Sequence, residues 1–183
     1  TKDTSNTSTL TLSPSSSSTF TGGVTVSNGT LKITENTSLG DTAAGGAYTI
    51  VSDGATLEVA GTGSLATAEP LRIRGTGLSN AGAVAFTSSA TLSGDVTLND
   101  NATVNVSATK AAVMSGVISD ASAAKGVTKA GTGTLTMSGA STNTYTGATT
   151  VSAGTLALGA NDKIANTSAL VVSNNATFNL ANY

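Results

Sequence analysis

The sequence contains no cysteine, no histidine and no tryptophan among its 183 residues. Without cysteine the chain has no disulfide framework, and without histidine it has no imidazole to serve as a general base or a metal ligand. Aromatic residues make up only 3% of the chain and charged residues 10%, which is little for a globular domain. We therefore expect an interior of small apolar side chains and a surface wetted by hydroxyl and amide groups.

The charge balance excludes some partners. The formal net charge is −2 and the isoelectric point is near 4.8, so no basic surface favours nucleic acid. No apolar run reaches the length needed to span a bilayer, and we expect no membrane insertion by this segment. The chain begins at Thr1 without a methionine, and we interpret it as a segment of a longer protein.

What the sequence has in abundance is alternation of apolar and small polar residues. In the stretch that runs from Lys129 to Gly159, Leu135 and Met137 share one face of an extended chain, while Thr134 and Thr136 share the other. A period of two is typical of short strands that bury one face. Glycines between these runs indicate turns.

This pattern belongs to a long internal repeat. Residues 19–33 (TFTGGVTVSNGTLKI) match residues 144–158 (TYTGATTVSAGTLAL) at an offset of 125 residues, and TLTLS at 9–13 matches TLTMS at 134–138 at the same offset. Residues 50–60 match residues 171–181 at an offset of 121. We interpret 1–183 as a single segment in which about 8–61 recurs at about 133–182, with linking coils at 62–132.

A shorter unit lies inside the long repeat. An apolar residue, a turn, a threonine and two alternating apolar residues occur at 26–33, 51–59, 98–106, 151–158 and 172–180. The spacings fit one or two units of roughly 21–27 residues, the size of a solenoid coil. We predict an all-β, right-handed parallel β-helix (β-solenoid) of roughly eight coils, with equivalent strands stacked about 4.8 Å apart.

The alternation also predicts which side chains face inward. Leu71 and Ile73 should point in and Arg72 and Arg74 out, whereas Pro14 should lie in a loop because proline cannot donate to a central ladder. Residues 107–128 could form a helical turn, but we favour strands at Val113 and Val117–Ile118. The remaining inward residues should be Leu31, Ile33, Leu57, Val59, Leu135, Met137, Leu156, Leu158, Phe178 and Leu180.

The repeat itself makes predictions about equivalent positions. Gly29 and Gly154 should occupy the same corner, and Phe20 and Tyr145 the same place, with the tyrosine hydroxyl reaching water or a polar partner.

The repeat also resembles a known family. The residues Lys129-x-Gly131-x-Gly133-Thr134-Leu135, Ser138-Gly139, Asn143-x-Tyr145-Thr146-Gly147 and Gly154-Thr155-Leu156 resemble the passenger-associated repeat of autotransporters, which are secreted surface proteins of Gram-negative bacteria. The first copy is degenerate, with Pro14, Ser18 and Phe20 in place of the glycine, asparagine and tyrosine. The resemblance implies a β-helical stalk or scaffold that is exported to the cell surface, a C-terminal translocating barrel elsewhere in the protein, and no catalytic residues.

Candidate chemistry is sparse. The acidic residues are scattered at corners, such as Asp53, Asp100 and Asp162, which does not favour the paired carboxylates of glycan-cleaving β-helices. Glu69 with Arg72 and Arg74 could bind an acidic sugar, but a solvated ion pair is the simpler interpretation. We therefore expect no enzyme, no catalytic, cofactor or metal residues and no cofactor.

The preferred function is structural, as a surface-exposed stalk or the shaft of an extracellular fibre. The alternatives are an adhesin module for glycans or host proteins and, third, a carbohydrate-active enzyme. The strands expected at 9–12 and 177–181 would expose unpaired edges. We expect them to be covered by further coils of the same polypeptide or by identical subunits stacked end to end.

Overall fold

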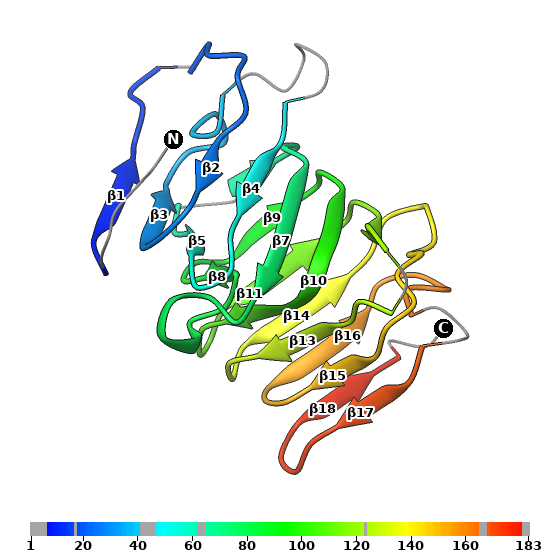
Figure 1. Ribbon diagram of the computed structural model, residues 1–183. Coiled ribbons are helices and arrows are strands. Elements are labelled where there is room, and N and C mark those ends of the chain that lie inside the picture. Colours follow the sequence, from blue (N-terminus) through cyan, green and yellow to red (C-terminus); the bar gives the residue numbers. More distant parts are fainter. Residues whose placement is uncertain are drawn as a thin grey trace.

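The computed structural model describes residues 7–16, 18–40, 47–61, 65–122, 124–164 and 168–180. Short strands pair in parallel and stack into a β-solenoid of about seven turns, from blue at one end to red at the other (Figure 1). The predicted all-β, parallel solenoid is confirmed. The helical content in the described ranges is one 3₁₀ turn, η2 (Leu78–Asn80).

The strands fall into three columns, which we call faces I, II and III. Face I contains β2 (Thr25–Val26), β4 (Thr49–Val51), β7 (Leu71–Gly75), the first part of β10 (Val96–Val106) and β12 (Ile118–Asp120). Face II contains β1 (Thr9–Leu12), β3 (Thr30–Ile33), β5 (Thr56–Val59), β8 (Val84–Phe86), the second part of β10, β13 (Val127–Ala130), β15 (Thr149–Val151) and β17 (Leu170–Val172). Face III contains β6 (Leu65–Thr67), β9 (Ala90–Leu92), β11 (Ala111–Met114), β14 (Thr134–Met137), β16 (Thr155–Leu158) and β18 (Thr177–Asn179).

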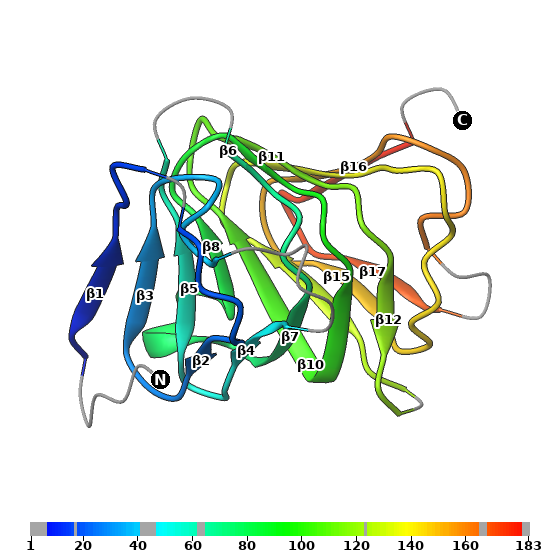
Figure 2. The same ribbon diagram turned by 90° about the horizontal axis from the view of Figure 1, so that it is seen from above.

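Strand β10 shows how the chain turns a corner between faces. Its first part pairs with β7 and β12 and its second part with β8 and β13. The bend falls at Asn99, Asp100 and Asn101, which are exposed between two stretches of alternating burial. Since β10 belongs to both columns, faces I and II form one continuous sheet. Figure 2 shows β1, β3 and β5 side by side at one end of this sheet and β17 towards the other.

The core is built from rows of inward side chains in register. On face III, Ala90, Ala112, Leu135, Leu156 and Phe178 occupy one level of successive turns. Eight of the ten predicted inward residues are buried: Leu31, Ile33, Leu57, Val59, Leu135, Met137, Leu156 and Leu158.

The two exceptions lie at the end of the stack. Phe178 is partly buried, and Leu180 is 52% exposed. The prediction that Leu180 faces the core is therefore wrong. Its coil has a partner on one side only, since β18 pairs with β16 and ends the face III column.

Several local predictions are confirmed. Strand β7 buries Leu71 and Ile73 and exposes Arg72 and Arg74. Pro14 lies outside β1, which ends at Leu12. The described part of 107–128 forms strands β11 and β12 and no helix. Within β11 it is Ala112 and Met114 that are buried.

The two copies of the long repeat lie on different faces. Copy one places β2 and β3 on faces I and II, whereas copy two places β15 and β16 on faces II and III. The local pairing is the same, because Leu10 pairs with Leu31 and Leu135 with Leu156. Face II leads from β3 through β5, β8, β10 and β13 to β15 in five turns, and β16 follows on face III, so the 125-residue offset equals five and one-third turns.

This displacement corrects two predictions about equivalent positions. Gly29 and Gly154 share a positive φ of 68° and 65°, but they occupy different corners. Phe20 is 41% exposed, whereas Tyr145 is fully buried, so the two aromatic residues do not occupy the same place. The repeat therefore specifies a strand, a turn and a second strand, and the same unit fits more than one corner.

Candidate functional site

Lys129 opens the repeat motif, and its side chain points into the solenoid. It occupies a row on face II between Val104 and Val151, with 1% of its surface exposed. Its Nζ donates to the carbonyls of Ala130 (2.7 Å), Gly131 (2.8 Å) and Ala153 (3.2 Å). Burial lowers the pKa of Lys129 to about 8. Because Ala153 belongs to the next turn, the ammonium group ties two successive turns at the corner between faces II and III.

The motif glycines allow these corners to stack closely. A Cβ atom on Gly133 would lie 2.2 Å from the carbonyl oxygen of Ser107, and one on Gly154 would lie 2.5 Å from the carbonyl oxygens of Gly131 and Gly133. Gly154 also has φ +65°, a conformation that other residues adopt at a cost. Any side chain at these two positions would push adjacent turns apart.

Asn143 and Tyr145 lie on face I next to β12, in a turn of the solenoid where this face has no strand. The Oδ1 of Asn143 accepts the N–H of Ile118 at 2.9 Å, and its Nδ2 donates to the carbonyl of Lys163 at 2.8 Å. The Tyr145 hydroxyl lies 2.5 Å from Oγ1 of Thr149, as predicted for a buried tyrosine. Burial raises the pKa of Tyr145. The Asn143 side chain therefore connects its turn to the turns before and after it, whereas the Tyr145 hydroxyl is bound within its own turn.

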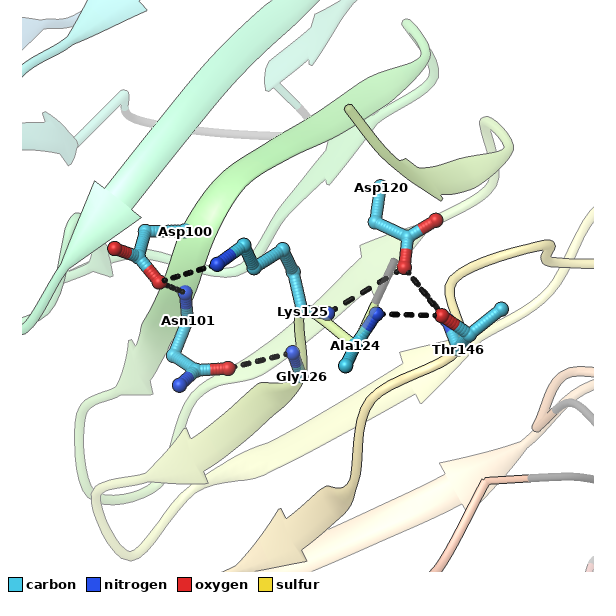
Figure 3. A network of polar contacts seen from close by, with 7 residues as sticks. All are labelled: Asp100, Asn101, Asp120, Ala124, Lys125, Gly126 and Thr146. Atoms are coloured by element: carbon cyan, nitrogen blue, oxygen red, sulfur yellow. Dashed lines mark hydrogen bonds and ion pairs between the residues drawn. The ribbon is translucent and has the colours of Figure 1, made fainter. Parts of the chain in front are cut away.

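The corner between faces I and II carries a polar network that spans three turns (Figure 3). Lys125 lies 3.3 Å from the Asp100 carboxylate, and the N–H of Gly126 donates to Oδ1 of Asn101 at 2.8 Å. The hydroxyl of Thr146 donates to Asp120 at 2.7 Å. The Asn101 N–H, then Lys125, lowers the pKa of Asp100, and the Thr146 hydroxyl lowers the pKa of Asp120. Both carboxylates are held in the ionised form that accepts hydrogen bonds.

The repeat motif of this chain matches a known family. A family model described as the passenger-associated-transport-repeat matches residues 5–33 and 127–158. The chain carries the passenger-associated repeat of autotransporters. The second matched range contains Lys129, Gly133, Asn143 and Tyr145, whose contacts are described above. No curated protein and no solved structure matches the chain.

Two carboxylates that are far apart in the sequence meet in space. Asp53 and Asp100 line one cavity of about 240 Å³ together with Arg74, Gly75 and Asn101. The charge of Arg74 contributes to the lowered pKa of Asp100. The corner thus brings a cation close to carboxylates of other turns. Sequence reasoning missed it because the three charged residues come from three different turns.

Glu69 is buried, whereas Arg72 and Arg74 are exposed. Its side chain is 2% exposed and accepts a hydrogen bond from Oγ1 of Thr49 at 3.1 Å. Burial raises the pKa of this carboxyl group, and the Thr49 hydroxyl opposes that shift. A solvated ion pair of Glu69 with Arg72 and Arg74 is therefore a wrong prediction, since Glu69 is not solvated.

The solenoid also has a shallow hollow at the corner between faces II and III. It has a volume of about 710 Å³, and its lining includes Thr87, Ser88, Ser89, Thr91 and Lys110. Ser88 Oγ donates to the carbonyl of Val59 and Thr87 Oγ1 to Glu58, so these hydroxyl groups are engaged in connecting turns.

The described ranges contain no group of three acidic, histidine or cysteine side chains placed to hold a metal ion. They also contain no helix of the length and apolarity needed to cross a membrane.

Proposed function

We propose that this passenger segment is a structural, non-catalytic stalk that holds other parts of an exported protein away from the cell. The observation that carries the proposal is the use of the motif side chains. Lys129, Asn143 and Tyr145 are buried, and their polar atoms bind groups of the same or adjacent turns. Such residues make a repeating unit that stacks, which is what a shaft requires.

The dimensions support a spacing role. Seven turns at about 4.8 Å each give a stack of roughly 34 Å. The passenger repeat is found in proteins that Gram-negative bacteria secrete to their surface, and we propose the extracellular surface as the site of this segment.

The ends of the stack support a second part of the proposal. On β17, Leu170, Val171 and Val172 are 40%, 49% and 43% exposed. The repeat offset makes β17 and β18 the counterparts of β4 and β5, which pair with β7 and β8 inside the stack. We infer that further parallel coils, from the same polypeptide or from an identical subunit, cover these edges.

A deletion that keeps the stack in register tests the stalk. Leu92, Met114, Met137 and Leu158 occupy one row of face III in successive turns. Removal of residues 93–158 therefore takes out three whole turns and should shorten the stack by about 14 Å. We expect the shortened protein to keep a β-rich circular dichroism spectrum and to lose that length in small-angle scattering.

The exported protein gives the functional readout. A tag placed beyond the segment should remain at the cell surface after deletion of 93–158 but lie closer to the membrane, as measured by fluorescence energy transfer to a membrane dye. An unchanged distance would contradict the spacing role. Cleavage of a polysaccharide by the purified full-length chain would contradict the non-catalytic part.

A further inference from the structure

Arg72 is held on the outer surface of face I by an aromatic ring. The guanidinium carbon of Arg72 (Cζ) lies 3.8 Å from the centroid of the Tyr48 ring. Arg72 is exposed and Tyr48 is half-buried. A cation stacked on an aromatic face is stabilised by the ring quadrupole. The ring therefore fixes the plane of the guanidinium group before any ligand arrives.

The strands on either side of Arg72 leave its charge uncompensated. Its register partners are Ile50 on β4 and Thr97 on β10. On face II, by contrast, Lys32 has Glu58 as its register partner and forms an ion pair of 3.1 Å. Arg74 lies beside Asp53 and Asp100 in the corner cavity. Asp95, which directly precedes β10, is engaged elsewhere, because its carboxylate accepts the N–H of Val117 at 2.8 Å.

The other described lysines with printed partners are used within the fold. Lys125 pairs with Asp100, Lys129 binds carbonyl groups of its corner, and Lys163 donates to the carbonyl of Ser141. Arg72 differs because its partner is a ring, which leaves the N–H edge of its guanidinium group free to meet a ligand. Such an edge matches the two oxygens of a carboxylate or a sulfate.

We propose that Arg72 and Tyr48 form a binding site for an acidic polysaccharide. Arg72 would donate two parallel hydrogen bonds to a carboxylate or sulfate group. The neighbouring strands lie about 4.8 Å away, so the Thr97 hydroxyl can reach a sugar hydroxyl while Ile50 and the Tyr48 ring pack against the C–H face of a sugar. This site goes beyond the stalk function and does not depend on it.

The charge of the chain favours a polysaccharide over a nucleic acid. The net charge is −2, and the site has one well-placed cation, while the neighbouring Arg74 shares its cavity with two aspartates. A nucleic acid requires several cations along its phosphates. A polysaccharide with one acidic group per one or two sugars matches the single guanidinium group, while neighbouring sugars contact uncharged side chains.

Titration of the full chain with three defined oligosaccharides tests the site. Hyaluronan fragments carry carboxylates, heparin fragments carry sulfates as well, and dextran fragments are neutral. We expect binding of one or both acidic probes, weakened by added salt, and no binding of dextran. Preference for hyaluronan would assign carboxylate as the anchor, and preference for heparin would assign sulfate.

Matched variants locate the binding on the surface. Arg72→Ala should weaken binding by about tenfold or more, since it removes charge-assisted hydrogen bonds. Arg72→Lys should give an intermediate loss, because an ammonium group cannot form the bidentate pair. Tyr48→Phe should preserve binding, because the ring remains. Lys110→Ala removes the same charge at the corner between β10 and β11, away from face I, and should change affinity less than twofold.

Three results would overturn the proposal. They are no binding of either acidic probe at millimolar concentration, equal binding of dextran, and an equal loss in Arg72→Ala and Lys110→Ala. Thermal midpoints of all variants should match that of the unmodified chain, because Arg72 is exposed. Arg72→Lys then serves as the readout if Arg72→Ala folds poorly.

Discussion

At the scale of single residues, Lys129 shows how a charged side chain can be part of a solenoid core. Its row on face II is otherwise apolar, and three carbonyl groups surround its ammonium. Lys129→Met keeps the length of the side chain but removes the donor. Because the carbonyls of Gly131 and Ala153 lose a charge-assisted hydrogen bond, we expect a loss of about 1–3 kcal/mol of unfolding free energy in urea.

Lys110 provides the control for this substitution. It follows the turn at the same kind of corner, between β10 and β11, and is partly exposed. Lys110→Met should change the free energy of unfolding by less than about 0.5 kcal/mol. Equal effects of the two substitutions would show that the buried ammonium contacts contribute nothing specific.

The pH dependence of stability gives a second prediction for Lys129. Burial lowers its pKa from 10.5 to about 8 in the folded chain. Between pH 8 and 10.5 the unfolded chain therefore binds more protons than the folded chain, so stability rises with pH across that window. We expect the difference in unfolding free energy between the unmodified chain and Lys129→Met to grow from pH 8 to pH 10.5. A difference that shrinks would show that the three carbonyls outweigh burial and raise the pKa.

At the scale of elements, the alternation of inward and outward side chains determines which positions of a strand tolerate substitution. Leu156 is fully buried in the face III row, whereas the adjacent Ala157 faces outward and is partly exposed. Leu156→Asp places a carboxylate among apolar side chains and should unfold at least its own turn. Ala157→Asp should leave the thermal midpoint within a few degrees. Equal midpoints in scanning calorimetry would contradict the assigned register.

The same local property explains what the sequence could predict. Inward and outward positions depend on a period of two, which is visible within four or five residues, so the burial of Leu31, Leu57, Leu135 and Leu156 was predictable. The face that a strand occupies depends on the length of every preceding corner. The corner at 76–83 is longer than the bend at 99–101, and such differences place the two repeat copies on different faces.

Contacts between turns were predictable only where the contacting residues belong to the repeated motif. The stacking of Arg72 on Tyr48 and the meeting of Asp53, Arg74 and Asp100 join residues about 21 to 47 positions apart, and no local pattern indicates either. The predictions for Phe20 and Leu180 were wrong for a related reason. Their burial depends on whether a neighbouring turn covers them, which is a property of the stack and not of the strand.

At the scale of the whole molecule, the stack ends in an exposed strand on each side. At one end, β1 exposes Thr9, Leu10 and Thr11 along its length. At the other, β17 is exposed throughout and β18 is nearly so. Strand edges with exposed apolar residues promote pairing with another chain. Both ends belong to the same face II column, which begins at β1 and ends at β17, so a second copy stacked head to tail would continue that column in parallel.

End-to-end association is the prediction that follows for the isolated chain. We expect its mass in light scattering to rise with concentration, since a contact of this kind joins different surfaces and does not close. Val172→Lys places a charge at the open end of the face II row, where the residue is 43% exposed and the fold can accept it. Thr128→Lys adds the same charge to an outward position in the middle of the stack and is the control. Val172→Lys should reduce association and Thr128→Lys should not, because only the former places an uncompensated ammonium where the next coil must pack. A chain that stays monomeric over a wide concentration range, or one that both substitutions affect equally, would show that the exposed strand edges do not stack on one another.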